Sequence, residues 1–272
     1  MSMTRTKSIV WDFTRLDRLS TEDTAIHRLD PRAKVLVTIA FIVSVISFNK
    51  YEVAALFPFF IYPAVMIAKS NLPTFFIVRK VAFVIPFALV IGLFNPFFDR
   101  EIVFHIGATG ISGGWISLMS IAVRAILTVS AAFILVGVTG FFPICGALER
   151  LAMPRLLAVQ LFLLFRYIFV LWEEGTRVMR SRELRSWEKR GKSLTTYGSV
   201  VGHLLLRTWL RAERIHMAMR TRGFTGEFHT RHPYRFGTPE VLFLLGWSAL
   251  FLLLRIHNVS LILGSFVMEV KA

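Results

Sequence analysis

The sequence is poor in cysteine and in charge. Its single cysteine, Cys145, excludes an internal disulfide and any metal site built from several cysteines. Charged residues make up only 18% of the 272 residues, whereas hydrophobic residues make up 55% and the mean hydropathy is +0.60. Soluble domains carry more charge and fewer apolar residues than this. The composition therefore excludes an ordinary soluble domain and predicts a membrane protein.

Acidic residues are also scarce, with 17 Asp and Glu against 32 Lys and Arg, which leaves a net charge of +15. Such an excess ordinarily points to nucleic acid or anionic lipid as a partner. The excess is local, because 14 of the basic residues lie between Arg177 and Arg235. Its meaning therefore depends on where that segment lies relative to the membrane.

The N-terminal part lacks the uninterrupted apolar core of a cleaved secretory signal, since charged residues recur through its first thirty positions. We interpret residues 1–32 as a polar N-terminal arm. The arm ends at Asp30 and Pro31, where Asp30 is expected to cap a helix whose first residue is Pro31.

Six segments are apolar over about the length of a membrane-crossing helix, which needs roughly 20 apolar residues. They are residues 33–48, 53–68, 81–98, 115–138, 156–172 and 240–254. If all six crossed, the N-terminal arm and the basic segment would face opposite sides, although basic loops tend to remain in the cytoplasm. Five crossings with 143–172 as an amphipathic region on the cytoplasmic face place 27 of the 32 basic residues inside.

Charges within the region 143–172 support this arrangement, because arginines such as Arg150, Arg155 and Arg166 would be costly at bilayer depth. Six crossings remain the alternative, since residues 156–165 are strongly apolar. We thus predict an all-α integral membrane protein with about five transmembrane helices plus cytoplasmic amphipathic helices. Its predicted parts are a cytoplasmic arm at 1–32, a four-helix transmembrane region at 33–140, a cytoplasmic helical region at 141–238, and a C-terminal transmembrane helix and tail at 239–272.

A short pattern occurs twice in the basic segment at an offset of 40 residues: Glu, five residues, Met, Arg, Ser or Thr, and Arg. Its copies are Glu173 to Arg182 and Glu213 to Arg222. Straight-chain residues favour a helix in both copies, and Glu173 and Arg177 have the spacing of an i,i+4 ion pair.

Gly191 and Gly223 are expected to end these two helices. Two matching helices with arginines near their ends would suit a two-fold symmetric soluble partner, which has two copies of any docking groove. A solvated basic helix pair that only contacts lipid headgroups is the alternative.

These segments resemble the CbiQ, or cobalt-type, branch of the EcfT family, the transmembrane coupling (T) components of energy-coupling-factor transporters. The resemblance covers most of the chain, and its segments include residues 27–34, 148–154 and 165–174. Its most specific parts are two arginine motifs, usually Ala-Arg-Gly or Ala-Arg-Ser in the family. Here they are Ser181-Arg182-Glu183, which departs from the family pattern at its first and third residues, and Thr221-Arg222-Gly223.

The resemblance implies a non-catalytic subunit that docks into two ATP-binding-cassette ATPase subunits. The docking residues it implies are Ser181, Arg182, Glu183, Thr221, Arg222 and Gly223, supported on the coupling helices by Met179, Arg180, Arg185, Met219, Arg220 and Phe224. ATP and Mg would bind to the partner ATPases, and this chain would bind no cofactor and no metal.

Closure of the ATPases would then move the coupling helices and tilt a separate substrate-capture (S) membrane protein, for which residues 156–172 would form an apolar sliding surface. The resemblance favours cobalt as the cargo, in connection with cobalamin biosynthesis, with nickel as the near alternative. It places the chain in a bacterial cell (inner) membrane, with the N-terminus and the coupling region in the cytoplasm. The partners would be the lipid bilayer and proteins, and no nucleic acid.

The sequence lacks the pattern of a phosphate-binding loop. Residues 186–193 have no leading glycine, and the glycine-rich segment 107–114 is expected to be a flexible outer turn. His229 and His232 lie three residues apart in a proline-containing loop, where histidines are more often solvated than metal-bound, and we expect no metal site.

Arg124 and Cys145 lie outside the patterns described above. Arg124 is the one charge well inside a clean span, and we expect it to pair with a backbone carbonyl or to extend toward the membrane surface rather than to act in a mechanism. Cys145 is expected to be an inert packing residue.

Two other functions stay open from the sequence. One is a membrane-anchored protein that binds anionic lipid or nucleic acid through residues 177–235, and the other is a self-sufficient permease that binds its substrate itself. A lipid or nucleic-acid binder would tolerate Lys at 182 and 222, because point charges suffice for phosphates, whereas forked docking to carboxylates would not.

Overall fold

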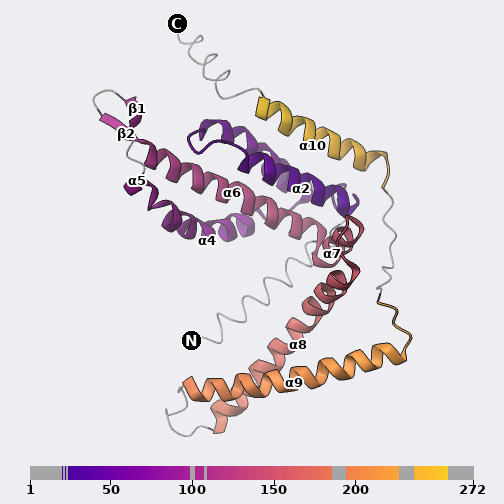
Figure 1. Cartoon of the computed structure of the whole chain (residues 1–272). Coiled ribbons are helices and arrows are strands. Elements are labelled where there is room, and N and C mark those ends of the chain that lie inside the picture. Colours follow the sequence, from indigo (N-terminus) through magenta and orange to yellow (C-terminus); the bar gives the residue numbers. More distant parts are fainter. Residues whose placement is uncertain are drawn as a thin grey trace. The chain divides into compact units, whose positions relative to one another are not determined.

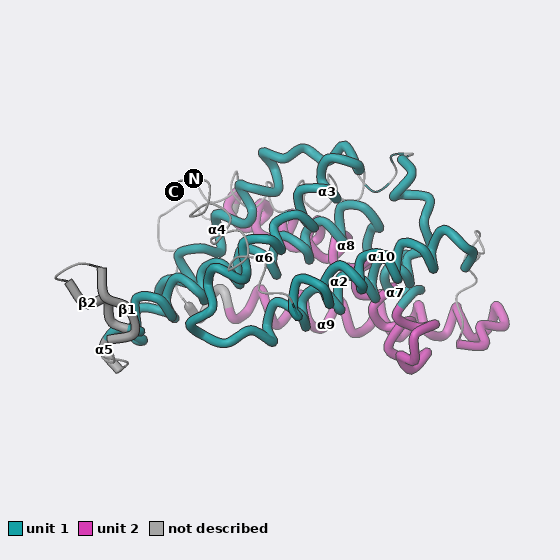
Figure 2. Tube along the Cα trace, turned by 90° about the horizontal axis from the view of Figure 1, so that it is seen from above, with its two compact units in different colours: residues 1–147, 233–272 teal, residues 148–232 magenta. Residues whose placement is uncertain are grey.

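The computed structural model of the chain describes residues 20, 22, 24–98, 102–106, 109–185, 194–226 and 236–256. These residues are helical apart from turns and one two-stranded hairpin (Figure 1). The chain divides into unit 1, residues 1–147 and 233–272, and unit 2, residues 148–232 (Figure 2). The predicted all-α fold class is confirmed, with the hairpin as its one exception among the described residues.

Unit 1 contains most of the elements. In chain order they are α2 (Pro31–Ile46), η1 (Ala54–Phe60), α3 (Ile61–Ser70), α4 (Thr74–Gly92), α5 (Asn95–Phe98), β1 (Ile102–Ile106), β2 (Thr109–Ser112), α6 (Gly113–Thr139), α7 (Phe141–Arg150), which continues into unit 2, and α10 (Thr238–Ile256). Unit 2 consists chiefly of two long helices, α8 (Arg155–Arg185) and α9 (Leu194–Thr221).

Within the described residues, four helices are long and apolar enough to cross a membrane: α4, α6, α8 and α10. The first predicted span, α2, has 16 residues and is about 24 Å long at 1.5 Å per residue, somewhat less than the roughly 30 Å of a hydrocarbon core. The second predicted span is a 3-10 helix, η1, followed directly by α3. With these apolar helices the chain is a multi-pass membrane protein.

The third predicted span, 81–98, is wrong at both ends. Its helix, α4, begins at Thr74 and ends at Gly92, so the basic residues Arg79 and Lys80 lie within the helix rather than in the preceding loop. A long basic side chain can extend from a helix end, and the Nζ of Lys80 lies 5.5 Å from the ring centroid of Phe76, one turn earlier. Charge alone was therefore a poor guide to this boundary.

The prediction of a flexible turn over residues 107–114 is wrong for residues 109–114, and residues 107 and 108 lie outside the described part of the chain. Residues 109–112 form β2, which pairs with β1 in an antiparallel hairpin, and Gly113 and Gly114 begin α6. Glycine is required at position 114 because a side chain there would collide with α5. A Cβ at Gly114 would lie 2.4 Å from the Cα of Pro96, so only glycine lets α6 begin this close to α5.

The predicted start of α2 is confirmed. Pro31 is its first residue, and the Oδ1 of Asp30 accepts a hydrogen bond from the backbone N–H of Arg32 at 2.8 Å. Near this point the N-terminal part of unit 1 meets α10, because the carboxylate of Glu240 accepts bonds from the N–H of Asp30 at 3.4 Å and of Gly237 at 2.8 Å. Asp30 and Glu240 are both buried, so segments 210 residues apart are joined inside the protein.

An aromatic cluster fills the core of unit 1 between α2, η1, α3 and α10. Phe41 on α2 lies with its ring centroid 4.6 Å from Tyr62 on α3 and 5.4 Å from Phe251 on α10. Trp247 packs edge-on against Tyr62 at 4.9 Å. The hydroxyl of Tyr62, which would be costly to bury alone, lies 3.1 Å from that of Thr38. The core therefore fixes the first helices against the last one.

Candidate functional site

The two helices of unit 2 cross each other, and both views place their C-terminal ends on opposite sides of the crossing (Figures 1 and 2). They come close at Gly175 of α8, where an added Cβ would lie 3.8 Å from a methyl group of Leu204 on α9. The duplicated pattern at 173–182 and 213–222 thus lies on two helices of one unit, as its residue types predict.

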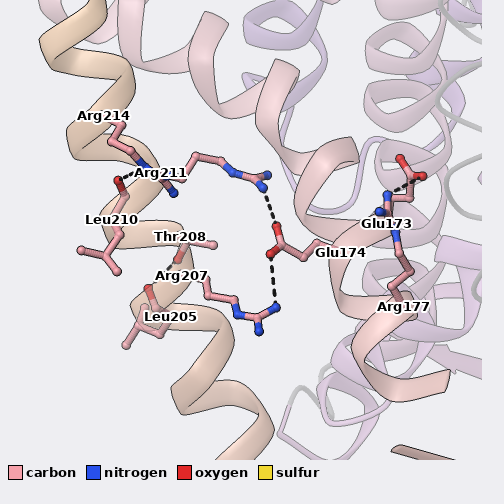
Figure 3. Close-up of polar contacts among 9 residues, drawn as sticks. All are labelled: Glu173, Glu174, Arg177, Leu205, Arg207, Thr208, Leu210, Arg211 and Arg214. Atoms are coloured by element: carbon pink, nitrogen blue, oxygen red, sulfur yellow. Dashed lines mark hydrogen bonds and ion pairs between the residues drawn. The ribbon is translucent and has the colours of Figure 1, made fainter. Parts of the chain in front are cut away.

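A cluster of three charges joins α8 to α9 at the crossing (Figure 3). The Oε2 of Glu174 lies 3.0 Å from the Nη2 of Arg211, and its Oε1 lies 3.9 Å from the Nη1 of Arg207. The Glu174 side chain is only 20% exposed. Because a partly buried carboxylate is screened less than one at the surface, this cluster links the two helices more firmly than a fully exposed ion pair would.

The neighbouring residue, Glu173, pairs within its own helix instead. The carboxylate of Glu173 accepts a hydrogen bond from Arg177 on the same helix at 2.8 Å, and both side chains are more than 70% exposed (Figure 3). This confirms the predicted i,i+4 pair. Since both partners belong to α8, the pair contributes to that helix and does not link it to α9.

The first residue of each arginine motif makes the same hydrogen bond. The hydroxyl of Ser181 donates a hydrogen bond to the carbonyl of Val178 at 2.9 Å, and that of Thr221 donates to the carbonyl of Ala218 at 3.0 Å. These bonds are related by the same offset of 40 residues as the sequence pattern. Each hydroxyl is therefore satisfied by its own helix, although Arg182 lies within α8 and Arg222 lies in the turn that follows α9.

Side-chain exposure differs slightly between the motifs. Arg222 is exposed and Arg182 is half-buried, while Glu183 and Gly223 are exposed. Among the supporting residues, Met179, Met219 and Phe224 are half-buried, whereas Arg180 and Arg220 are exposed. Met179 and Met219 thus face inward, and the arginine that follows each of them faces outward.

The end of α9 is as predicted. Gly223 has φ +75°, its N–H donates to the carbonyl of Arg220 at 3.0 Å, and the N–H of Phe224 donates to that of Met219 at 3.0 Å. These two bonds define a Schellman C-cap. In α8 the described helix continues to Arg185, so Arg182 lies within its last turns rather than beyond its end. The predicted C-cap Gly191 lies outside the described residues.

An apolar groove of about 890 Å³ runs between the N-terminal half of α8 and the C-terminal half of α9. Its walls include Leu156, Leu163 and Leu171 from α8 and Trp209, Ile215 and Met219 from α9. Several of these side chains, Leu156 and Trp209 above all, are strongly exposed. Exposed apolar surface of this kind marks sites of contact with protein or lipid.

The described residues contain no group of three or more His, Cys, Asp or Glu that could hold a metal ion. His229, His232, the segment 186–193 and residues 227–235 lie outside the described part of the chain.

Arg124 donates to the carbonyl of Asn49 at 2.6 Å, which confirms its predicted pairing with the backbone. Cys145 is buried, as a packing residue should be.

The contact of Glu174 with Arg207 and Arg211 was not among the features predicted from the sequence. One signal was present: Arg207 and Arg211 are four residues apart, which places both on one face of α9, turned toward a common partner. The partner itself could not be identified, because Glu173 and Glu174 are adjacent and either could have faced the second helix.

Known proteins resemble this chain over most of its length. The sequence profile of the CbiQ family, described as cobalt transport protein, matches residues 22–234. An uncharacterized protein of Methanocaldococcus jannaschii is 28% identical over 222 residues, covering 77% of this chain and 74% of that protein. The energy-coupling factor transporter transmembrane protein EcfT of Streptococcus thermophilus is 27% identical over 228 residues (75% and 82%), and that of Listeria innocua is 25% identical over 219 residues (74% and 81%).

Proposed function

Because the chain belongs to the CbiQ cobalt transport protein family, we propose that it is the transmembrane coupling component of an ATP-driven energy-coupling-factor importer. In this role it hydrolyses no ATP itself. Two ATP-binding-cassette ATPase subunits bind ATP and Mg, and this chain transmits their closure to a separate substrate-capture membrane protein. The recurrence of the arginine motif near the ends of two helices, with the same hydroxyl-to-carbonyl bond just before Arg182 and Arg222, is the single observation that carries the proposal.

Two equivalent arginine sites on crossing helices match the requirement of a partner that is itself a pair of like subunits. A guanidinium offers five N–H donors in a planar fork and can hold a carboxylate with two parallel hydrogen bonds. One ATPase subunit would receive Ser181-Arg182-Glu183, and the other would receive Thr221-Arg222-Gly223. Since the helix ends lie on opposite sides of the crossing (Figure 1), the two ATPases can dock without competing for the same space.

The apolar groove between α8 and α9 is the surface that we assign to the substrate-capture protein. Its leucines, Trp209 and Ile215 would let an apolar helix slide without losing specific hydrogen bonds. In this proposal α8 lies along the cytoplasmic face, together with α9 and the N-terminal arm, because this arrangement keeps most of the positive charge inside. The protein would lie in a bacterial inner membrane.

Cobalt is the proposed cargo. The family description supports it, whereas the curated relatives in Streptococcus thermophilus and Listeria innocua are named for the transporter class and carry no metal in their names. The metal would be captured by the separate membrane protein, so nickel and cobalt should be distinguished there and not by this chain.

The test uses the reconstituted complex of this chain with its ATPases and capture protein in proteoliposomes. The variant R182K/R222K keeps both charges and removes both forks, and we expect ATP-driven Co(II) uptake to fall by about tenfold or more, since each charged hydrogen bond is worth roughly 1.5–3 kcal/mol. The matched control is R177K/R214K, in which each arginine contacts its own helix.

Uptake at the wild-type rate by R182K/R222K would overturn the coupling function and favour the lipid or nucleic-acid binder. Binding of Co(II) by the purified chain alone, without its companions, would instead favour a self-sufficient permease.

A further inference from the structure

The charge cluster at the crossing of α8 and α9 has no part in the docking motifs, and it suggests a separate role for one residue. We propose that Glu174 is a positioning residue that fixes the angle between the two helices by holding Arg207 and Arg211, so that displacement of the arginine motifs is transmitted through unit 2. The inference rests on the proposed coupling function.

Glu174 is suited to this role by its position. Its two oxygens face guanidinium groups from successive turns of α9, at 3.0 Å and 3.9 Å (Figure 3). Two contacts separated along α9 resist rotation about the contact point, whereas one contact would act as a free joint. The low exposure of the Glu174 side chain reduces screening by water and salt.

Apolar packing does little to set this angle. The helices approach closely at Gly175 and Leu204, but the N-terminal half of α8 and the C-terminal half of α9 diverge around the open groove of about 890 Å³. Leu156 and Trp209, which could have locked the pair if packed together, are 68% and 72% exposed. The polar cluster is therefore the part of the crossing with a defined geometry.

Small rotations at the crossing would be amplified at the motifs. Arg182 follows Glu174 by two helical turns and Arg222 follows Arg211 by about three, distances of roughly 12 and 16 Å along the helix axes. A change of about 10° in the crossing angle would therefore move each motif by roughly 2–3 Å. Without the cluster, closure of the ATPases could be absorbed by such rotation instead of reaching the membrane helices.

The experiment compares E174Q with E173Q in the complete reconstituted complex. Both variants remove one negative charge from the same turn of α8, but only E174Q breaks a link to α9. We expect E174Q to lower the number of Co(II) ions taken up per ATP hydrolysed by about tenfold, with ATP hydrolysis retained, and E173Q to match the wild type. From the other helix, R211Q should behave like E174Q, and R214Q, whose arginine contacts the carbonyl of Leu210 in its own helix, should behave like the wild type.

Non-additivity provides a further check. The double variant E174Q/R211Q should lose no more than the more severe single variant, because both remove the same interaction. Equal losses from E174Q and E173Q, or strict additivity in the double variant, would overturn the inference.

A distance measurement separates this inference from the proposed function. Spin labels at I168C on α8 and M217C on α9, in a Cys145→Ser background, report the crossing directly on the purified chain. We expect a single narrow distance distribution that broadens in E174Q and R211Q but not in E173Q or R214Q; an unchanged distribution in E174Q would refute the positioning role. If no ATPase associates with the wild-type chain, the proposed function fails, while this measurement still decides what Glu174 does.

Discussion

The guanidinium of Arg124 on α6 donates a hydrogen bond from Nη2 to the backbone carbonyl of Phe48, 2.8 Å away, just beyond the end of α2. A second arginine acts on the same segment: Arg255 of α10 donates to the carbonyl of Ser47 at 2.8 Å and lies 4.2 Å above the Phe48 ring. The last carbonyls of a helix have no partner within it. Two other helices of unit 1 thus supply these bonds, which explains a charge within an apolar span.

Replacing Arg124 by methionine should destabilise unit 1. The substitution keeps the apolar stem but removes the charged hydrogen bonds to the carbonyls of Phe48 and Asn49, at a cost of about 1.5–3 kcal/mol. Thermal unfolding in detergent should show a lower midpoint for R124M. The exposed Arg79 offers a control, and equal midpoints for R124M, R79M and the wild type would contradict the assigned role.

Gly114 should not tolerate alanine. The added Cβ would meet the Cα of Pro96 at 2.4 Å and the carbonyl oxygen of Asn95 at 2.8 Å, so the backbone of α5 or α6 must move. We expect G114A to cost about 1–3 kcal/mol in unfolding free energy. At Gly246 in α10 nothing lies within 4 Å of the added atom, and G246A should be neutral or stabilising by up to about 1 kcal/mol. A lower melting midpoint for G246A than for G114A would contradict the close contact between Gly114 and Pro96.

Two helix ends that each have a residue of positive φ and the same closing backbone bond should respond in opposite ways to glycine and alanine. Ala152 has φ +108°, a conformation that favours glycine, and the N–H of Met153 donates to the carbonyl of Leu148 at 3.0 Å. Gly223 occupies the matching position after α9. We expect A152G to stabilise the chain and G223A to destabilise it, each by about 1 kcal/mol, as measured by chemical denaturation. A loss of stability in A152G would argue against the backbone conformation described for that residue.

Cys145 should be poorly reactive in the folded protein. It is 1% exposed, and burial raises its pKa to about 11, above the usual value of roughly 8.5. Because only the thiolate reacts with maleimide, little reagent should be incorporated at pH 7.5, and the rate should rise about tenfold per pH unit as the pH increases toward the raised pKa.

The control for this measurement is a cysteine at Leu184, which is 80% exposed. L184C should be labelled rapidly without denaturant, whereas labelling of Cys145 should require that the protein first be unfolded with a denaturing detergent. Comparable rates at the two positions in the folded protein would show that Cys145 is not buried.

Local patterns predicted those features that depend on neighbouring residues in the chain. The cap at Asp30 and Pro31, the ion pair of Glu173 with Arg177 and the glycine end of α9 all follow from contacts within one turn or one helix. The partner class of Arg124 was also predictable, because a guanidinium in an apolar segment needs an acceptor and backbone carbonyls are the commonest ones available.

Errors arose where two segments meet. The early start of α4 was obscured by Arg79 and Lys80, whose charges suggested a loop. The hairpin of β1 and β2 was obscured by glycines that suggested a flexible turn, although Gly114 is required by a close contact with Pro96. Neither contact partner is visible in the local residue pattern.

The sequence by itself determined that the protein is helical and membrane-embedded, that it carries two like arginine motifs, and which family it belongs to, because apolar length and short-range spacing are properties of the chain alone. Only the tertiary structure decided which glutamate joins α8 to α9 and which carbonyls receive Arg124. Adjacent residues on a helix point about 100° apart, so the choice between Glu173 and Glu174 depends on where a second helix lies, and that is fixed by packing.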